Sequence, residues 1–258
     1  PSPKAAVKVV KVVKASVPKI SSPETKARKA ADAQRVKKQK AVAIEALKRV
    51  PTFPAPRLAF FEKQSELLCG QHALNNFFRN TNRGGSAPRF VSTNRQDNVY
   101  ETAGLFDLLS FCRVRALLLA AEVGYVLEAD AAENIACQDG GNYDINLLHA
   151  AAQRGFPQAR LSDIVYNSSQ TIYEHGGQDY VGPEVLEAHL RSSVNAGLIV
   201  NIRSAHYVAV VHVGNDPLSG WVIIDSIVGP PKISYTAQGV MTAIMAKGFE
   251  AAFSIYLP

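Results

Sequence analysis

The chain has 258 residues, of which 47% are hydrophobic and 19% are charged. That composition is globular, and the length allows one domain of roughly 200 residues with an appendage. No run of about 18 apolar residues occurs, so the sequence predicts no contact with the membrane interior. The three cysteines, Cys69, Cys112 and Cys137, have no regular spacing, which excludes a disulfide framework and a cysteine zinc site. We expect no cofactor, and an intracellular, reducing location in the cytoplasm or nucleus.

The charge is distributed unevenly along the chain. Residues 1–50 contain 14 Lys and Arg against 3 Asp and Glu, a balance of +11, whereas the remainder has a balance of −5. A basic arm on a mildly acidic body favours a polyanionic partner for the arm. The sequence therefore predicts that the arm binds nucleic acid or other protein chains of a large assembly.

The arm is predicted to contain one long helix. Residues 1–21 are rich in Lys, Val and Ala and favour a solubilising, disordered segment. Ser22-Pro23-Glu24 then supplies a capping hydroxyl, a proline and an acid in the first turn, so a helix is expected from there to about Val50. The prolines that follow indicate a stiff linker, which divides the chain into an arm, residues 1–56, and a body, residues 57–258. Basic clusters at residues 26–29 and 37–40 loosely resemble a bipartite nuclear signal.

The first half of the body is predicted to be helical. Residues 67–79 have helical apolar spacing, residues 81–98 are polar and favour a loop, and residues 100–123 favour one or two helices. A turn is expected at 139–142, and further helices at 145–154 and 183–195.

The last part of the chain changes period. Residues 198–203, 207–213, 221–225 and 252–257 are apolar, rich in Val, Ile or aromatic side chains, and separated by turn residues. Such segments predict strands of an antiparallel sheet. Helices followed by strands indicate an α+β fold in which the helical part packs on the sheet.

The candidate chemistry centres on Cys69, which lies at the expected start of a helix. The partial positive charge of a helix N-terminus favours a thiolate, the nucleophilic form of cysteine. His206 precedes a predicted strand that can face this helix, and Asp225 closes the next strand and can hold the imidazole in one tautomer. Gln64 lies five residues before the cysteine, where its amide can help to hold an oxyanion together with the Cys69 N–H. Each of these residues, taken alone, is compatible with a structural role. The presence of all four in this order is what indicates a cysteine protease.

Several runs resemble Josephin-domain deubiquitinases, a family of papain-like cysteine proteases. The resemblance covers about residues 58–80 and 139–258. The catalytic signature of that family is similar to Phe61-Glu62-Lys63-Gln64 with Cys69-x-Gln71-His72-x-Leu74-Asn75-Asn76. Its later motifs are similar to Gly141-Asn142-Tyr143-Asp144-Ile145, His206-Tyr207-Val208-Ala209-Val210, Trp221-Val222-Ile223-Ile224-Asp225-Ser226 and Ala252-Phe253-Ser254-Ile255-Tyr256.

The resemblance implies a papain-like fold of Josephin type and hydrolysis of the bond after the ubiquitin C-terminus. It implies that Cys69 is the nucleophile, His206 the base, Asp225 the orienting residue and Gln64 an oxyanion donor, with ubiquitin or ubiquitinated proteins as partners. The third member is Asp, where Asn also occurs in the family, and residues 81–138 do not match. His72 is an alternative base, although a residue one turn along the same helix points alongside the thiol rather than across a cleft.

Two other functions remain open from the sequence. The body can serve as a tethered structural module of a viral capsid or nucleoprotein particle. It can also cleave a different protein junction, for example during the maturation of a particle. The intact set of Gln64, Cys69, His206 and Asp225 favours an active enzyme, and the two roles can coexist in a virion-associated enzyme.

Overall fold

The structure is a computed structural model that describes most of the chain after residue 22. The described residues are 23–64, 68–81, 87–93, 99–122, 124–128, 131–132, 137–138, 142–167, 184–203, 206–214, 216 and 218–258. The arm segment 1–21 and the turn residues 139–141 lie outside them. None of the helices that the structure describes combines the length and apolar character that a membrane crossing needs.

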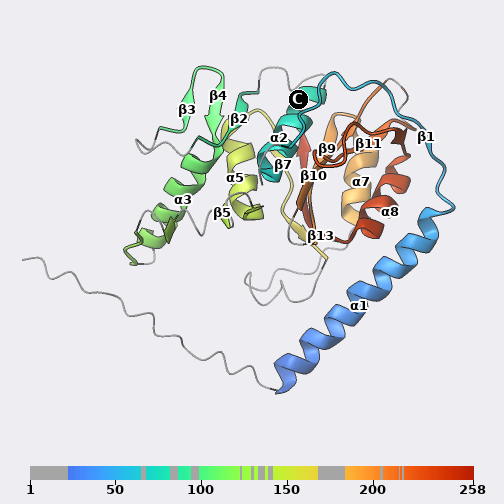
Figure 1. Cartoon of the computed structure of the whole chain (residues 1–258), viewed down its shortest axis with the longest axis horizontal. Helices are drawn as coiled ribbons and strands as arrows, with labels where there is room; N and C mark the ends of the chain where they lie inside the picture. Colours follow the sequence, from blue (N-terminus) through green and yellow to red (C-terminus); the bar gives the residue numbers. More distant parts are fainter. Residues whose placement is uncertain are drawn as a thin grey trace, which may run out of the picture.

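An antiparallel sheet forms the centre of the body (Figure 1). Its strand order in the described chain is β11-β10-β9-β13-β7, and β8 pairs with another part of β13. The strands are β7 (Arg160–Leu161), β8 (Val165–Tyr166), β9 (Ala196–Ile202), β10 (His206–His212), β11 (Trp221–Ile224) and β13 (Phe249–Tyr256). The β9–β10 register pairs His206 with Ile202, so His206 lies at one end of the sheet.

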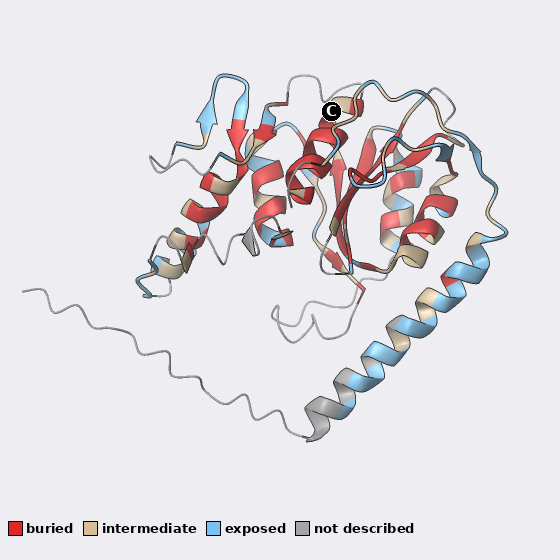
Figure 2. Cartoon of the chain, viewed as in Figure 1, coloured by how far each residue is buried: buried red, intermediate tan, exposed pale blue. Residues whose placement is uncertain are grey.

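Helices cover both faces of the sheet (Figure 1). On one face, α2 (Cys69–Asn80) and α5 (Ile145–Gly155) pack against alternate strand residues such as Ile199, Tyr207 and Phe253. On the other face, α7 (Glu184–Ser192) and α8 (Ala237–Lys247) pack against Val208, Val210 and their neighbours. The period of two in a strand sends successive side chains to opposite faces, so both faces of these continuous apolar runs are buried. Figure 2 shows the resulting layer of buried residues in α2 and the strands.

The predicted α+β class is confirmed, and two element predictions in the first half are corrected. Within the expected loop at 81–98, residues Arg89–Val91 form strand β2. Within the expected helical region at 100–123, residues Glu101–Thr102 and Leu105–Asp107 form β3 and β4, and only Leu108–Glu122 forms helix α3. The buried rings of Phe90 and Phe106 sit on paired positions of β2 and β4, and this tertiary packing overrides the local polar composition. The short strands β5 (Cys137–Gln138) and β6 (Asn142–Tyr143) form a separate pair.

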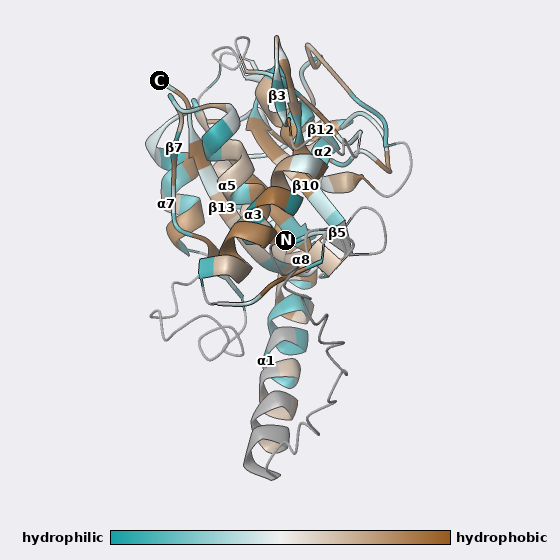
Figure 3. Cartoon of the chain, turned by 90° about the vertical axis from the view of Figure 1, so that its left-hand side faces the viewer, coloured by the Kyte–Doolittle hydropathy of each residue, from teal (hydrophilic) through white to brown (hydrophobic). Residues whose placement is uncertain are grey.

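The arm helix α1 (Pro23–Leu47) begins where the sequence predicts and contacts the body at its C-terminal end. Ala43 is buried, and the helix packs against α8. Beyond it, β1 (Phe53–Pro54) pairs with β12 (Ile233–Ser234). Figure 3 shows the rest of α1 extending away from the body.

Three asparagines of α2 fasten segments before and after this helix to it. The Asn76 side chain accepts a hydrogen bond from the Glu62 N–H (2.8 Å) and donates one to the Glu62 carbonyl (3.1 Å). Asn80 brackets the backbone of Phe60 in the same way, and Asn75 brackets Phe90 of β2. Each asparagine amide bonds the N–H and the carbonyl of one residue, as the backbone of a neighbouring strand would do. Backbone groups that have no strand partner are satisfied in this way. Residues 60–62 are therefore held along α2, and Gln64 follows two residues later.

Replacing Asn76 by alanine is expected to destabilise the protein substantially. The change removes two hydrogen bonds and leaves the Glu62 N–H and carbonyl without their partner, a cost of about 2–4 kcal/mol in the free energy of unfolding. Urea denaturation of the variant measures this loss. Asn146→Ala, at an exposed position on α5, is the matched control and is expected to change the free energy by less than about 0.5 kcal/mol. Equal stability of the two variants would contradict the bracketing role.

Candidate active site

Cys69 is the first residue of α2 and is almost fully buried, with 3% of its surface exposed. No side chain caps this helix, because the preceding Leu68 has no polar group. The first N–H groups of a helix have no acceptor within the helix. Without a capping side chain, these groups can donate to an acceptor in front of the helix start. Gly70 is required by close packing, since a Cβ there would lie 2.7 Å from Leu148 and 3.0 Å from Tyr143. These contacts hold the start of α2 against α5.

His206 joins Cys69 to Asp225. Its Nε2 lies 2.9 Å from Asp225 Oδ1, and the Cys69 side chain is close enough to act on the same ring. Because Nε2 is occupied by the carboxylate, Nδ1 is the ring nitrogen left for the thiol. The structure thus brings together Cys69 from a helix start, His206 from a strand start and Asp225 from the end of the neighbouring strand.

The surroundings of His206 favour its charged form. Burial alone would lower the pKa of the imidazole, but the hydrogen bonds to Asp225 and Cys69 and the negative charges of both groups raise that pKa to about 9. The ring is therefore an imidazolium at neutral pH. A charged ring beside a thiol stabilises the thiolate, as nucleophilic catalysis by cysteine requires.

Asp225 is held in the ionised state. Burial raises the pKa of its carboxyl group, but this effect is outweighed by the His206 hydrogen bond, the positive charge of the ring, the Ile227 N–H and the Lys247 charge, so the net pKa lies below the usual value. Oδ1 accepts the backbone N–H groups of Ile227 (3.1 Å) and Val228 (3.4 Å). The carboxylate is thereby fixed in orientation, and it fixes the ring in turn.

Gln64 lies beside the third member of this set. Its backbone N–H donates to the Ser226 carbonyl (3.0 Å), and its side-chain Oε1 accepts the Ser226 hydroxyl (3.2 Å). Ser226 is buried and directly follows Asp225. These two hydrogen bonds fix the Gln64 backbone and amide oxygen against the residue that follows Asp225.

His72 has a structural partner instead of a place in the triad. Its Nδ1 lies 3.1 Å from Glu62 Oε2, and both side chains are largely buried. Burial raises the Glu62 pKa, but hydrogen bonds from His72, Asn75 and Arg89 more than offset this and lower it. This network joins α2, β2 and the segment before Gln64. No pattern in the sequence identifies Glu62, Ser226 or Lys247 as residues that support the site. Asn is unfavourable inside a helix, so the asparagines within α2 are the sequence feature that indicates side-chain hydrogen bonds to the backbone of neighbouring segments.

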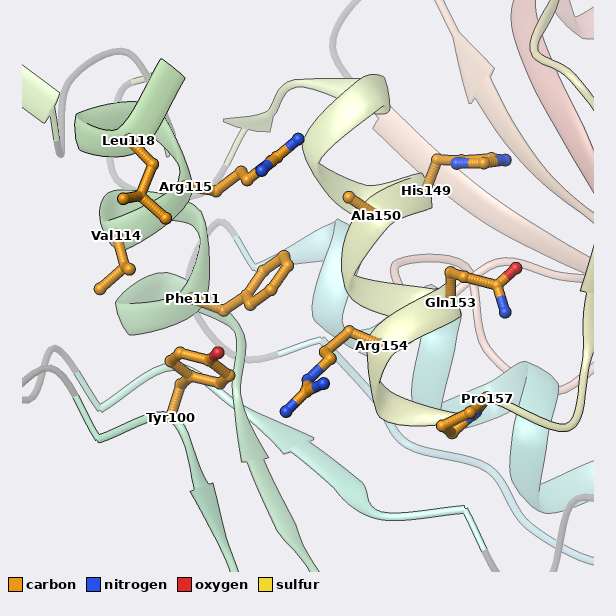
Figure 4. A pocket seen from close by; sticks show the side chains of 10 residues that line it. All are labelled: Tyr100, Phe111, Val114, Arg115, Leu118, His149, Ala150, Gln153, Arg154 and Pro157. Carbon is orange, nitrogen blue, oxygen red and sulfur yellow. The ribbon is translucent and has the colours of Figure 1, made fainter. Parts of the chain in front are cut away.

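A separate hollow of about 530 Å³ lies between α3 and α5. Phe111 and Arg115 project into it from α3, and Ala150 and Arg154 line it from α5 (Figure 4). Arg154 is paired with Glu101 at 2.7 Å. None of the four candidate catalytic residues lines this hollow, so it is distinct from the site at the start of α2.

The described part of the chain contains no cluster of His, Cys, Asp or Glu side chains arranged to hold a metal ion. Cys69, His206 and Asp225 are the residue types that covalent catalysis by a thiolate uses as nucleophile, base and orienting residue, and Gln64 is hydrogen-bonded to Ser226 beside Asp225. No protein-family model matches the chain, and no curated protein matches it either.

Proposed function

We propose that the chain is a papain-like cysteine hydrolase of Josephin type that cleaves the bond after the C-terminus of ubiquitin. The observation that supports the chemistry best is the His206 ring, which is hydrogen-bonded to Cys69 on one side and to Asp225 on the other. The choice of ubiquitin rests on the resemblance of the Gln64–Asn76 and His206–Asp225 runs to Josephin-domain deubiquitinases. The Josephin type of the fold rests on the same runs and on the helix–sheet arrangement around them.

The proposed reaction begins with attack of the Cys69 thiolate on the carbonyl carbon of the scissile bond. The oxyanion that forms accepts hydrogen bonds from the Cys69 N–H and the Gln64 amide. His206 then gives its proton to the leaving amine, the C–N bond breaks and a thioester remains. Neutral His206 removes a proton from water, the hydroxide attacks the thioester, and the sulfur leaves as thiolate beside the reprotonated ring. Asp225 holds the ring in the orientation that both proton transfers need.

The basic arm gives the proposed enzyme a second partner. Lys37 and Lys38 on α1 and Lys48 and Arg49 in the turn that follows it are exposed, and between residues 37 and 49 Glu45 is the one acid, already paired with Lys48. We assign this surface to nucleic acid or to acidic chains of a large particle such as a virion. The chemistry requires a free Cys69 thiol, which fits an intracellular, reducing compartment.

Ubiquitin with a thiol-reactive group at its C-terminus tests the proposal. We expect the wild-type chain to form a covalent adduct that is heavier on a gel by the mass of one ubiquitin probe, and Cys69→Ala to form none. Cys112→Ala is the matched control and should label normally, because Cys112 is fully buried and lies outside the site. If folded wild-type protein reacts at Cys69 with a small thiol reagent but not with the ubiquitin probe, the ubiquitin proposal is wrong.

The pH dependence of activity gives a test of the triad. The His206 pKa of about 9 predicts that the alkaline limb of the kcat/KM profile for an amide substrate lies near pH 9, where the proton needed by the leaving group is lost. Asp225→Ala removes the largest interaction that raises this pKa, so the alkaline limb should move to lower pH. The full pH–rate profile of each protein measures the shift. An unchanged alkaline limb in Asp225→Ala would contradict the assigned role.

A further inference from the structure

Three cations from distant parts of the chain gather beside the Asp225 end of the site. Lys247 closes α8, and its Nζ lies 3.8 Å from Asp225 Oδ2. Arg203 follows β9, and its Nε donates to the Lys247 carbonyl (3.2 Å). Lys40 comes from the arm helix α1. Its Nζ and Arg203 Cγ each lie 3.4 Å from the point that a Cβ on Gly248 would occupy. Lys40, Arg203 and Lys247 are called the cation cluster below.

The cluster has an excess of positive charge that its surroundings do not neutralise. Within the described part of the chain, no carboxylate forms an ion pair with Lys40 or Arg203, and Asp225, the partner of Lys247, is also bonded to His206. Like charges that converge repel one another, so the arrangement favours an external anion. A single cation is enough to interact with the C-terminal carbonyls of α8, and Arg203 already does so. The position of Lys40 is therefore not explained by the end of this helix.

The backbone at Arg203 supports a specific placement of this side chain. Arg203 has φ 56°, a left-handed conformation that non-glycine residues adopt uncommonly and at some energetic cost. Its backbone N–H donates to the Gly248 carbonyl (3.0 Å), and its side chain reaches the end of α8. The side chain remains exposed. The fold thus holds an exposed guanidinium next to the residues that orient His206.

The position of the cluster indicates which part of a substrate would meet it. In the proposed reaction His206 gives a proton to the leaving amine, so the leaving chain must lie on the His206 side of Cys69. Asp225 binds Nε2, the ring nitrogen other than the one left for the thiol, and Lys247 Nζ lies 3.8 Å from Asp225. A leaving chain that passes over the ring therefore runs toward the cluster, whereas the ubiquitin that forms the thioester stays on Cys69.

We propose that Lys40, Arg203 and Lys247 select leaving chains that carry Asp or Glu next to the cleaved bond. The inference rests on the proposed function and names its substrate class: ubiquitin conjugates whose acceptor lysine has acidic neighbours. It also gives the arm helix a role in the active site, because Lys40 belongs to α1. Exposed ion pairs of this kind are worth a few-fold each in binding, and salt weakens them.

The test uses the full chain and three ubiquitin substrates. Two are isopeptide-linked to a fluorescent peptide whose lysine is flanked by two Asp or by two Asn, and the third carries a small fluorophore in place of the peptide. Wild type is expected to cleave the Asp substrate about 3- to 10-fold faster in kcat/KM than the Asn substrate at low salt, with the ratio falling towards one at about 0.5 M salt. Lys40→Gln combined with Arg203→Gln should bring the ratio close to one at low salt.

Two controls separate the possible outcomes. Arg115→Gln combined with Arg191→Gln removes the same charge from exposed positions on α3 and α7, outside the cluster, and should keep the wild-type ratio. Lys40→Gln alone should lower the ratio if Arg203→Gln affects folding. Cleavage of the small-fluorophore substrate with equal rates on the Asp and Asn substrates in wild type would overturn the inference and leave the proposed function standing. Absence of cleavage of all three would overturn both. A ratio of one, together with loss of duplex oligonucleotide binding in the Lys40/Arg203 variant, would assign the cluster to nucleic acid and overturn the inference.

Discussion

Replacing His206 by alanine is expected to lower kcat/KM for a ubiquitin amide substrate by about 10²- to 10⁴-fold, the usual contribution of a general acid–base group. The variant loses the imidazolium that stabilises the Cys69 thiolate, and it loses the proton donor for the leaving amine. The Asp225 carboxylate is then left without its ring partner, which the structure places at 2.9 Å. Steady-state kinetics with a fluorogenic ubiquitin amide measures the effect.

His149→Gln is the matched control for this substitution. The His149 ring lies 2.9 Å from the Ser162 carbonyl and packs edge-on against Phe253, away from Cys69. We expect this variant to retain most of its activity, even if its stability changes. A His206→Ala variant that folds and keeps more than about a tenth of wild-type kcat/KM would be incompatible with the base and acid roles.

Replacing Gln64 by alanine is expected to lower kcat by about 10²- to 10³-fold, as removal of one oxyanion donor does in other hydrolases. The change removes the amide whose oxygen accepts the Ser226 hydroxyl and which, in the proposed reaction, donates an N–H to the oxyanion. KM should change little, because the interaction forms fully only in the transition state. The measurement is the separate determination of kcat and KM.

Alkylation distinguishes this role from general damage to the site. Reaction of a thiolate with chloroacetamide forms no carbonyl oxyanion on the carbon that is attacked, so Gln64→Ala should alkylate at Cys69 at nearly the wild-type rate. Gln153→Ala, which removes an amide bonded to the Ala159 carbonyl, should leave both reactions unchanged. Parallel losses of alkylation and hydrolysis in Gln64→Ala would show instead that the variant disturbs the thiolate.

The strands around the site could be predicted from sequence because their signal is local. Runs such as Tyr207–Val213 are continuous and apolar, as strands buried on both faces are. The start of α2 could be placed from the helical apolar spacing after Cys69. The pairing of His206 with Asp225 followed from their positions at the ends of neighbouring antiparallel strands, 19 residues apart.

The features that were missed depend on contacts between distant residues. Helix α8 is apolar on most sides and has buried residues around much of its surface, so it lacks the amphipathic period that identifies a helix. Strand β2 is set by its pairing with β4, and the packing of the predicted helix α1 on α8 also joins distant residues. Ser226 supports Gln64 across 162 positions of sequence, and Lys40 reaches Gly248 from the arm. No local pattern contains these pairs, which exist only once the chain has folded.

The ion pair between Cys69 and His206 is the central claim, and the rate of alkylation of Cys69 at pH 6 tests it most directly. Mass spectrometry of the Cys69 peptide after timed exposure to chloroacetamide gives this rate in wild type and in His206→Ala, without any assumption about the substrate. An isolated cysteine is almost wholly a thiol at pH 6 and reacts slowly. The account predicts that wild type reacts at least about ten times faster than His206→Ala, because the imidazolium stabilises the thiolate. Equal rates in two folded proteins would contradict it.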